Sequence, residues 1–291
     1  MTAATGPRAT RLAALALVGN AFVWGTSWWP FRRLAAAGLH PLWATAIIFT
    51  LASLAIAAAR PRALGQVLRT PALWLLVAAA GVTNAAFNWA IVIGDVVRVV
   101  LLFYLMPLWT VLLARFVLRE RLTRAAALRI ALGAIGAAIV LWPPATDAST
   151  GWAMELPLPR TLADWLGIVG GASFAFNNVM LRREADRPEE GRALAMFVGG
   201  ALVALALAMA LTATGAAPAP PAPAAPWLAL TAALTLLFLA GNLSLQYGAA
   251  RLPANRTAVV MLSEVLFASL SAVLLGGGVL SGRLVVGGAF I

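Results

Sequence analysis

The sequence has 291 residues, of which 62% are hydrophobic and only 11% are charged, and its mean hydropathy is +0.91. Soluble domains carry about 25% charged residues, so this composition excludes a soluble protein and predicts an integral membrane protein. All 21 basic residues are Arg, and they lie between apolar runs instead of forming a stripe, which argues against a nucleic-acid-binding protein. The absence of Cys excludes disulfides, thiolate chemistry and Cys-ligated metals.

Ten apolar segments follow one another along the chain, and most approach the roughly 20 residues with which a helix crosses the hydrocarbon core of a bilayer. The segments are approximately Leu12–Phe31, Leu42–Ala59, Ala72–Gly94, Val99–Phe116, Ile130–Trp142, Trp165–Leu181, Ala193–Ala213, Trp227–Ala250, Ala258–Val279 and a last one from Leu284. The last is too short to cross, so we expect the tenth helix to be truncated at Ile291. The predicted fold is an all-α integral membrane protein with ten transmembrane helices.

Arginines are distributed unequally between the two sides of these ten segments. With the N-terminus placed inside, sixteen Arg fall on the inner side and five on the outer side. Cytoplasmic loops collect positive charge, so the sequence predicts a cytoplasmic N-terminus. We expect a multi-pass protein of a bacterial inner (plasma) membrane.

An internal repeat relates the two halves of the chain. The stretch Asn84–Thr123 returns as Asn242–Ser281, 158 residues later, with rare polar and aromatic residues in one register. The matched pairs are Asn84 with Asn242, Asn88 with Gln246, Trp89 with Tyr247, Arg98 with Arg256, Trp109 with Phe267 and Thr123 with Ser281. Because five helices is an odd number, the second copy is expected to be inverted. We predict a first five-helix repeat at 1–143, an outer connecting loop at 144–160 and a second repeat at 161–291, with a binding site between the repeats near the midplane.

Short motifs in both halves resemble one family of membrane proteins. The run Phe22–Ser27 in the first helix, Pro107 in the fourth and Leu118–Thr123 after it resemble the EamA family of the drug/metabolite transporter superfamily. Weaker echoes stand at Phe174-Ala175 and Gly278–Ser281. The resemblance implies a ten-helix basket of two inverted repeats around a central cavity, which moves small metabolites outward without a metal or organic cofactor.

The chain departs from that family pattern at two helix ends. Arg119 replaces the usual Gly, and Val265 stands where a Glu-Pro pair has Pro, with Glu264 in place. Within the family, the Trp-rich first helix and the Asn-rich third and sixth helices are similar to the YddG-type aromatic amino-acid exporters. This narrower resemblance implies an aromatic or large neutral amino acid as substrate.

Side-chain amides are the first group of candidate site residues. Asn84 and Asn88 are four residues apart, as are Asn242 and Gln246, so each pair shares a helix face. An unpaired amide in hydrocarbon is costly, so these amides must face protein or a wet cavity. Either they join helices at about 1 kcal/mol each, or they line a cavity that offers donors and acceptors to a zwitterion. In the sixth helix we favour Asn177 over its neighbour as a cavity residue.

Glu264 is an acidic residue well inside an apolar segment, where acids are costly and usually functional. Three roles remain open: it binds a substrate ammonium, it carries a coupling proton, or it pairs in neutral form with a nearby hydroxyl or amide. Its matching position in the first repeat is Met106, so the acid breaks the symmetry of the repeat.

Aromatic residues form the second group of candidates, because they would enclose an indole or phenyl ring. The alternative is that they lie in the interfacial belts or face lipid. These candidates are Trp24, Trp28, Trp89, Tyr104, Phe174 and Tyr247.

Two charged clusters have plain structural interpretations. Arg32 and Arg33 end the first helix and are expected to reach the lipid headgroups. Asp95 and Arg98 lie three residues apart and are expected to form a local ion pair.

Nothing in the sequence favours an enzyme, since there is one His, no Gly-rich phosphate loop and no base beside the intramembrane serines. We therefore predict a secondary transporter that exports amino acids by alternating access, with the bilayer and a small-molecule substrate as its partners and protons as a candidate coupling ion. The alternatives are export of another small metabolite or drug, such as a nucleobase or a cationic compound, or a non-transporting structural partner in the membrane.

Overall fold

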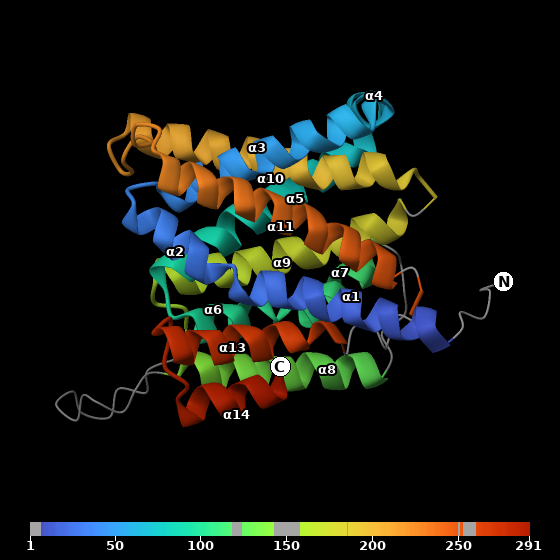
Figure 1. Ribbon diagram of the computed structural model, residues 1–291. Coiled ribbons are helices and arrows are strands. Elements are labelled where there is room, and N and C mark those ends of the chain that lie inside the picture. Colours follow the sequence, from blue (N-terminus) through green and yellow to red (C-terminus); the bar gives the residue numbers. More distant parts are fainter. Residues whose placement is uncertain (1–6, 118–123, 143–157, 185, 250, 253–259) are drawn as a thin grey trace.

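The computed structural model describes residues 7–117, 124–142, 158–184, 186–249, 251–252 and 260–291, and all regular structure within these ranges is helical. The helices run side by side in one bundle (Figure 1). They are α1 (Pro7–Thr26), α2 (Trp28–Ala36), α3 (Pro41–Ala59), α4 (Pro61–Arg69), α5 (Pro71–Ile93), α6 (Val96–Phe103), α7 (Met106–Val117), α8 (Arg124–Leu141), α9 (Leu162–Arg183), α10 (Glu189–Ala213), α11 (Ala225–Ala249), α13 (Ser263–Leu275) and α14 (Gly282–Phe290).

Five stretches of helix are long and apolar enough to cross a membrane, which agrees with the predicted class of protein. They are Pro41–Ala59, Pro71–Ile93, Val96–Val117, Glu189–Ala213 and Pro226–Gly248, and two shorter apolar helices cover Ile130–Leu141 and Ser263–Leu275. The count of ten crossings stays a prediction. The Leu118–Thr123 motif, the start of the ninth segment and most of the predicted loop 144–160 lie outside the described residues.

Two interruptions and one extra helix were not predicted from the apolar segments. The first segment is divided into α1 and α2 at Ser27, and the fourth into α6 and α7 at Tyr104 and Leu105. Helix α4 occupies the Arg-rich connection after α3, where it buries Ala63 and Val67 and turns its other face outward. Prolines at the first positions of α3, α4 and α5 explain why these helices begin where they do, since a first-turn proline loses no helical hydrogen bond.

Helix α5 lies at the centre of the bundle and packs most extensively on α10 and α9. The contact with α10 is close because Gly81 and Gly199 face each other: a Cβ at Gly199 would clash with the carbonyl oxygen of Val77, and one at Gly81 with Val203. Helices α3 and α10 lie at one edge of the bundle, and α8, α13 and α14 lie at the other (Figure 1). The close backbone approach of α5 and α10 at Gly81 and Gly199 is typical of helix packing in membranes.

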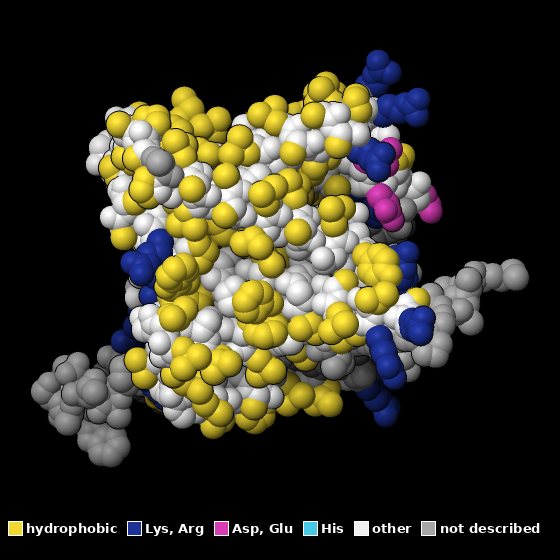
Figure 2. Space-filling model, in the orientation of Figure 1, with side chains coloured by type: hydrophobic (Ala, Val, Ile, Leu, Met, Phe, Trp, Pro, Cys, Tyr) yellow, Lys and Arg dark blue, Asp and Glu magenta, His cyan; other side chains and the backbone are white. Residues whose placement is uncertain are grey.

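Many of the main helix contacts occur in pairs that the predicted repeat would interchange, if α1 corresponds to α9, α3 to α10, α5 to α11, and α6 with α7 to α13. Helix α5 packs on α9 and α10, and α11 packs on α1 and α3; likewise α1 packs on α13, and α9 packs on α6 and α7. Charged side chains on the face shown in Figure 2 gather at the two ends of the bundle, with hydrophobic side chains across the band between them.

The predicted local ion pair between Asp95 and Arg98 is wrong. Arg98 binds both carboxylate oxygens of Asp164 on α9, at 2.6 and 3.0 Å, and donates to the carbonyl oxygen of Val140 on α8. The Asp95 carboxylate instead caps α6 by accepting from the Arg98 amide, and it accepts from the amide of Val279 at 2.9 Å. The sequence could not show this because Asp164 is 66 residues away from its partner.

Arg32 also has a different role from the one expected. Its guanidinium donates to the carbonyl oxygens of Ile91 and Gly94 at 3.1 and 2.6 Å, and lies 5.1 Å from the ring of Trp28. It therefore satisfies the unpaired carbonyl groups at the end of α5 instead of reaching toward headgroups. Arg33 stacks on Trp29 nearby.

Candidate functional site

A cavity of about 580 Å³ lies in the interior of the bundle between the two halves of the chain. Its walls come from α1, α5, α8, α9, α10, α11, α13 and α14, and from the break between α6 and α7. Seven of the twelve predicted site residues line it: Trp24, Asn84, Tyr104, Phe174, Asn177, Asn242 and Glu264. Its size falls within the range of ordinary small-molecule sites.

Aromatic side chains form much of the apolar wall. Phe103 lies 4.7 Å from Phe87 and 5.4 Å from Phe174 between ring centroids, so one ring each from α5, α6 and α9 meet. Trp24 is held by Phe238 of α11, which stacks on it at 4.5 Å with an interplanar angle of 15°. These rings give the cavity flat surfaces on which a planar apolar group can stack.

Glu264 lies in the first turn of α13 and is only 8% exposed. The hydroxyl of Tyr104 lies 3.0 Å from Oε2 of Glu264 and 3.3 Å from the carbonyl oxygen of Met261. Tyr104 stands where α6 ends, so the break in the helix brings this hydroxyl to the carboxyl group. The pairing with a hydroxyl matches one of the three roles expected for Glu264, and the residue still lines the cavity.

The cavity amides differ in how far their hydrogen bonds are satisfied. Asn84 donates to the carbonyl oxygen of Ala80 at 2.8 Å, and Asn242 accepts from Gln246 at 2.7 Å. Asn177 is 1% exposed, and neither its Nδ2 nor its Oδ1 has a hydrogen-bond partner. Buried polar atoms are normally paired, so Asn177 offers a free donor and a free acceptor to whatever fills the cavity.

Three predicted residues pack in the core outside the cavity. Trp28 is 2% exposed and donates to the hydroxyl of Ser271 at 2.8 Å. Asn88 is fully buried and donates to Thr45 of α3 at 3.2 Å, while Trp89 meets His40 edge-on at 5.5 Å. Their contacts are those of residues that join helices.

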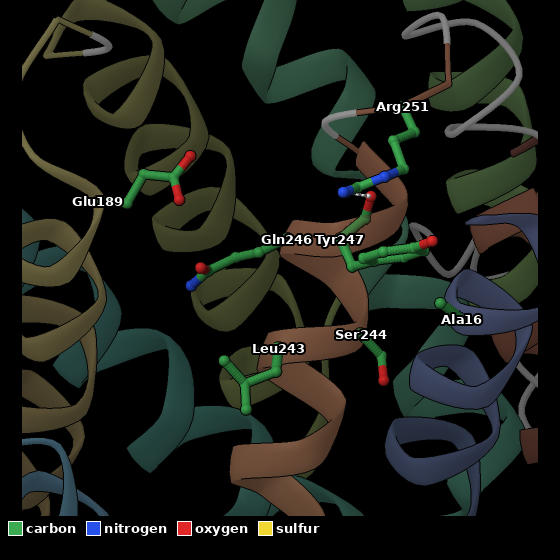
Figure 3. Close-up of a pocket in the computed structure, with 7 residues that line it drawn as sticks. All are labelled: Ala16, Glu189, Leu243, Ser244, Gln246, Tyr247 and Arg251. Atoms are coloured by element: carbon green, nitrogen blue, oxygen red, sulfur yellow. Dashed lines mark hydrogen bonds between the residues drawn. The ribbon is translucent and has the colours of Figure 1, made fainter. Parts of the chain in front are cut away.

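Gln246 and Tyr247 line a second pocket, of about 490 Å³, between α1, α10 and α11 (Figure 3). Glu189 faces it from α10, and the Arg251 guanidinium lies 3.7 Å from the ring of Tyr247. The hydrogen bond from Gln246 to Asn242 joins this pocket to the wall of the central cavity. These two predicted residues therefore lie near the end of α11 and not in the central cavity itself.

Several lining residues were missed by sequence reasoning. They are Asn20, Thr83, Phe87, Phe103, Asn178 and Phe290, together with apolar residues of α7 and α8. A signal existed for Asn20, which lies four residues before Trp24 and so shares its helix face. In the described part of the chain, no Arg, Lys or His lines the cavity, and no group of three or more His, Cys, Asp or Glu side chains is placed to hold a metal ion.

Comparison with known proteins agrees with this arrangement. Residues 11–142 match the EamA-like transporter family. A solved crystal structure of another protein has the same fold over nearly the whole chain, with a TM-score of 0.58 and 21% sequence identity over 96% of this chain and 93% of that one. No curated protein matches the chain. This family match lies within the first predicted repeat, and it supports a membrane transporter of small molecules.

Proposed function

We propose that this protein exports aromatic or large neutral amino acids, by alternating access between its two halves. The observation that carries the proposal is the composition of the central cavity. Aromatic rings, side-chain amides and one carboxyl group line the same space; both halves of the chain contribute rings and amides, and the carboxyl group comes from the second half. An amino acid with a large apolar side chain has the matching parts: an apolar body and a small polar head.

The rings of Trp24, Phe103 and Phe174 would enclose the substrate side chain, since their faces and edges suit an aromatic ring. The amides would take the polar head: Asn177 has both a donor and an acceptor free. Glu264 would bind the ammonium group or exchange it for a proton, with the Tyr104 hydroxyl holding the carboxyl group between these states. Protons are thus the candidate coupling ion, and no resident metal or organic cofactor is needed.

Alternating access requires two arrangements of the helices that open the cavity to opposite sides of the membrane. Differential binding of the substrate to these two arrangements is all that coupling requires. The exchanged pairs of helix contacts support an inverted repeat, with units 1–143 and 161–291 joined by the segment 144–160. We place the N-terminus in the cytoplasm of a bacterial cell because most arginines fall on that side. The network of Arg98, Asp164 and Asp95 then lies at the outer end, where it ties α6, α8 and α9 together.

A second candidate substrate class is a cationic amine or drug. Glu264 has the one acidic side chain among the described lining residues, and no basic side chain lines the cavity there. A lipophilic cation would therefore meet a carboxylate and aromatic faces, to which cations are attracted.

Counterflow in proteoliposomes tests the proposal. Vesicles containing purified protein are loaded with unlabelled substrate, and uptake of labelled Phe, Trp, Leu or a nucleobase is compared with uptake into empty vesicles. We expect exchange of the three amino acids. If none of them exchanges above background, the amino-acid proposal fails; if only the nucleobase or an amine does, the substrate class is different.

Repeating the assay across a pH step with Glu264→Gln distinguishes proton exchange at Glu264 from a purely structural role. A carboxyl group that exchanges a proton for substrate makes the rate depend on the pH gradient, and the amide abolishes that dependence. An unchanged rate and pH dependence in the variant would leave Glu264 with only its structural bond to Tyr104.

A further inference from the structure

One residue of the cavity wall has a side-chain oxygen with no hydrogen-bond partner among the described residues. Asn20 of α1 is 1% exposed and lines the cavity. Its Nδ2 contacts the sulfur of Met261 at 3.6 Å, which is a weak acceptor, and its Oδ1 has no hydrogen-bond partner. Since Nδ2 is turned toward Met261, Oδ1 is the atom of this amide that is left without a partner among the described residues.

This acceptor belongs to the same cluster as the carboxyl group of Glu264. Met261 contacts Asn20 through its sulfur and Tyr104 through its carbonyl oxygen, and Tyr104 in turn binds Glu264. Helices α1 and α13 pack closely beside this cluster at Gly25. A Cβ atom at that position would lie only 2.7 Å from the backbone oxygen of Glu264. The unpaired amide oxygen of Asn20 and the carboxyl group of Glu264 therefore belong to one cluster of contacts around Met261.

The balance of hydrogen-bonding groups in the cavity shows what the ligand must supply. Asn20 has an unpaired oxygen, Glu264 is an acceptor when ionised, and Asn177 has an unpaired oxygen and an unpaired NH2 group. None of the described lining residues is a cation that could neutralise a carboxylate. A primary ammonium group has three donors and a positive charge, so it satisfies the acceptors, whereas a carboxylate finds only neutral amide donors.

We propose that Asn20 and Glu264 form a subsite for a primary ammonium group, and that the cavity requires this amine but not a carboxylate beside it. The inference rests on the proposed function and narrows it: the substrate class is a primary amine with a large apolar side chain, whether its second polar group is a carboxylate or a neutral carboxamide. Asn177 serves either group, because an amide donates to an oxygen and accepts from an N–H.

The test is competition against counterflow of labelled Phe in proteoliposomes. The unlabelled competitors are Phe, phenylalaninamide, phenethylamine and N-acetylphenylalanine. Phe, phenylalaninamide and phenethylamine are expected to compete at similar concentrations. N-acetylphenylalanine, whose nitrogen is neutral, is expected to need a concentration at least about tenfold higher, as for the loss of one charge-assisted hydrogen bond.

Variants at position 20 test whether Asn20 causes the preference for primary amines over N-acetylphenylalanine. Asn20→Leu removes the acceptor and is expected to weaken competition by every amine about tenfold, so that the advantage over N-acetylphenylalanine largely disappears. Asn20→Asp keeps an acceptor at the same place and is expected to retain the preference. The matched control is Asn88→Leu, which removes an equally buried amide outside the cavity and should leave the order of competitors unchanged. Monodisperse elution and thermal unfolding identify any variant that fails to fold.

The outcomes separate this inference from the proposed function. If Phe exchanges but N-acetylphenylalanine competes equally well, or if the compounds without a carboxylate do not compete, the ammonium subsite is wrong while amino-acid export stands. If labelled Phe does not exchange at all, the proposed function fails and the subsite fails with it. If the preference for amines is strong in the parent protein and is lost in Asn20→Leu but not in Asn88→Leu, both are supported.

Discussion

Replacing Asp164 by Asn should loosen the end of the bundle that we place outside. Asp164 is 1% exposed, and its carboxylate receives two hydrogen bonds from Arg98 as well as the backbone amides of Arg160 and Thr161 at 3.1 and 3.4 Å. The amide side chain keeps the shape of the carboxylate but removes its charge and turns one acceptor into a donor. Arg98 then keeps one side-chain oxygen at position 164 and the carbonyl oxygen of Val140 as acceptors, but it has lost its charged partner and one hydrogen bond.

The size of the effect follows from how deeply the pair is buried. Removing one partner of a fully buried pair costs about 3–5 kcal/mol, and exposed pairs are worth about 0–1 kcal/mol. The side chains here are 2% exposed at Asp164 and 25% at Arg98, so we expect a loss of about 2–3 kcal/mol for Asp164→Asn. The corresponding fall in unfolding temperature is roughly 5–10 °C.

The pH dependence of stability provides an independent check on the same residue. Burial raises the pKa of Asp164, but the hydrogen bonds from Arg98, Arg160 and Thr161 lower it further, so the pKa lies below its ordinary value of 3.8. A carboxylate whose pKa is lowered by folding stabilises the protein above the unfolded pKa, and this contribution is lost as the pH falls through the folded pKa. The stability difference between the parent protein and Asp164→Asn should therefore be constant above pH 5 and shrink below pH ~4.

A double-mutant cycle in detergent, with thermal unfolding as the readout, completes this test. Arg98→Gln, Asp164→Asn and the combination are compared with the parent protein. We expect a coupling free energy of about 2 kcal/mol between the two positions. A coupling below ~0.5 kcal/mol would refute the reasoning, because the pair would then be no stronger than an exposed one.

Three further changes have expected outcomes of their own. Gly199→Ala should lower the free energy of unfolding by roughly 2–3 kcal/mol, because the added Cβ meets the carbonyl oxygen of Val77. Gly19→Ala, with open space around it, should be neutral or slightly stabilising in the same unfolding assay. Equal effects of the two changes would contradict the close packing of α5 on α10. Burial lowers the pKa of His40, whose Nδ1 accepts a hydrogen bond from the amide of the second residue of α3, so stability should fall as the pH drops below 6.5. His40→Asn, which can also cap the helix, should lose that part of the pH dependence. Parallel curves of stability against pH for the two proteins would contradict this role of His40. Tyr104→Phe should slow counterflow about tenfold, since the neighbouring carboxyl group loses its hydroxyl partner; an unchanged rate would mean that this bond does not hold the site.

The all-helical class could be read from the sequence, and in the described residues apolar length and composition identify five stretches of helix that are long enough to cross a membrane. The interruption after Phe103 was harder to see, since Val99–Phe116 reads as one continuous apolar run. Pro107 was the available signal: it lies in the first turn of α7, where a proline marks a helix start. Helix α4 was missed because it is only nine residues long and its Arg side chains resemble those of a loop.

The site could be predicted only in part, for a geometric reason. Residues four apart on a helix differ by about 40° in direction and about 6 Å along the axis. That is enough for Asn84 to face the cavity while Asn88 faces Thr45 of α3. The same step separates Asn242, in the cavity wall, from Gln246, which lies in the side pocket (Figure 3).

The arginines show a second limit of sequence reasoning. Arg32 ends on backbone carbonyl groups of α5, and Arg98 ends on a carboxylate of α9. Neither acceptor can be recognised from the residues around the arginine, because both depend on which helix ends lie next to each other in the bundle. Local spacing predicted a headgroup contact for one and a neighbouring acid for the other, and both predictions were wrong.

The central claim, that the cavity between the two halves is the transport pathway, is tested most directly with a single cysteine inside it. The chain has no Cys, so no native thiol interferes. Thr83 lines the cavity and is 7% exposed, and its hydroxyl bonds only to its own helix, so Thr83→Cys changes little else. Gly19→Cys, at an open position on α1, is the matched control outside the cavity.

The measurement is counterflow of labelled Phe after reaction with a small membrane-permeant thiol reagent, with and without unlabelled Phe present during the reaction. We predict that modification at position 83 abolishes exchange, that unlabelled Phe slows the modification, and that complete modification at position 19 leaves exchange intact. Full modification at position 83 with undiminished exchange, or with no protection by substrate, would contradict the account.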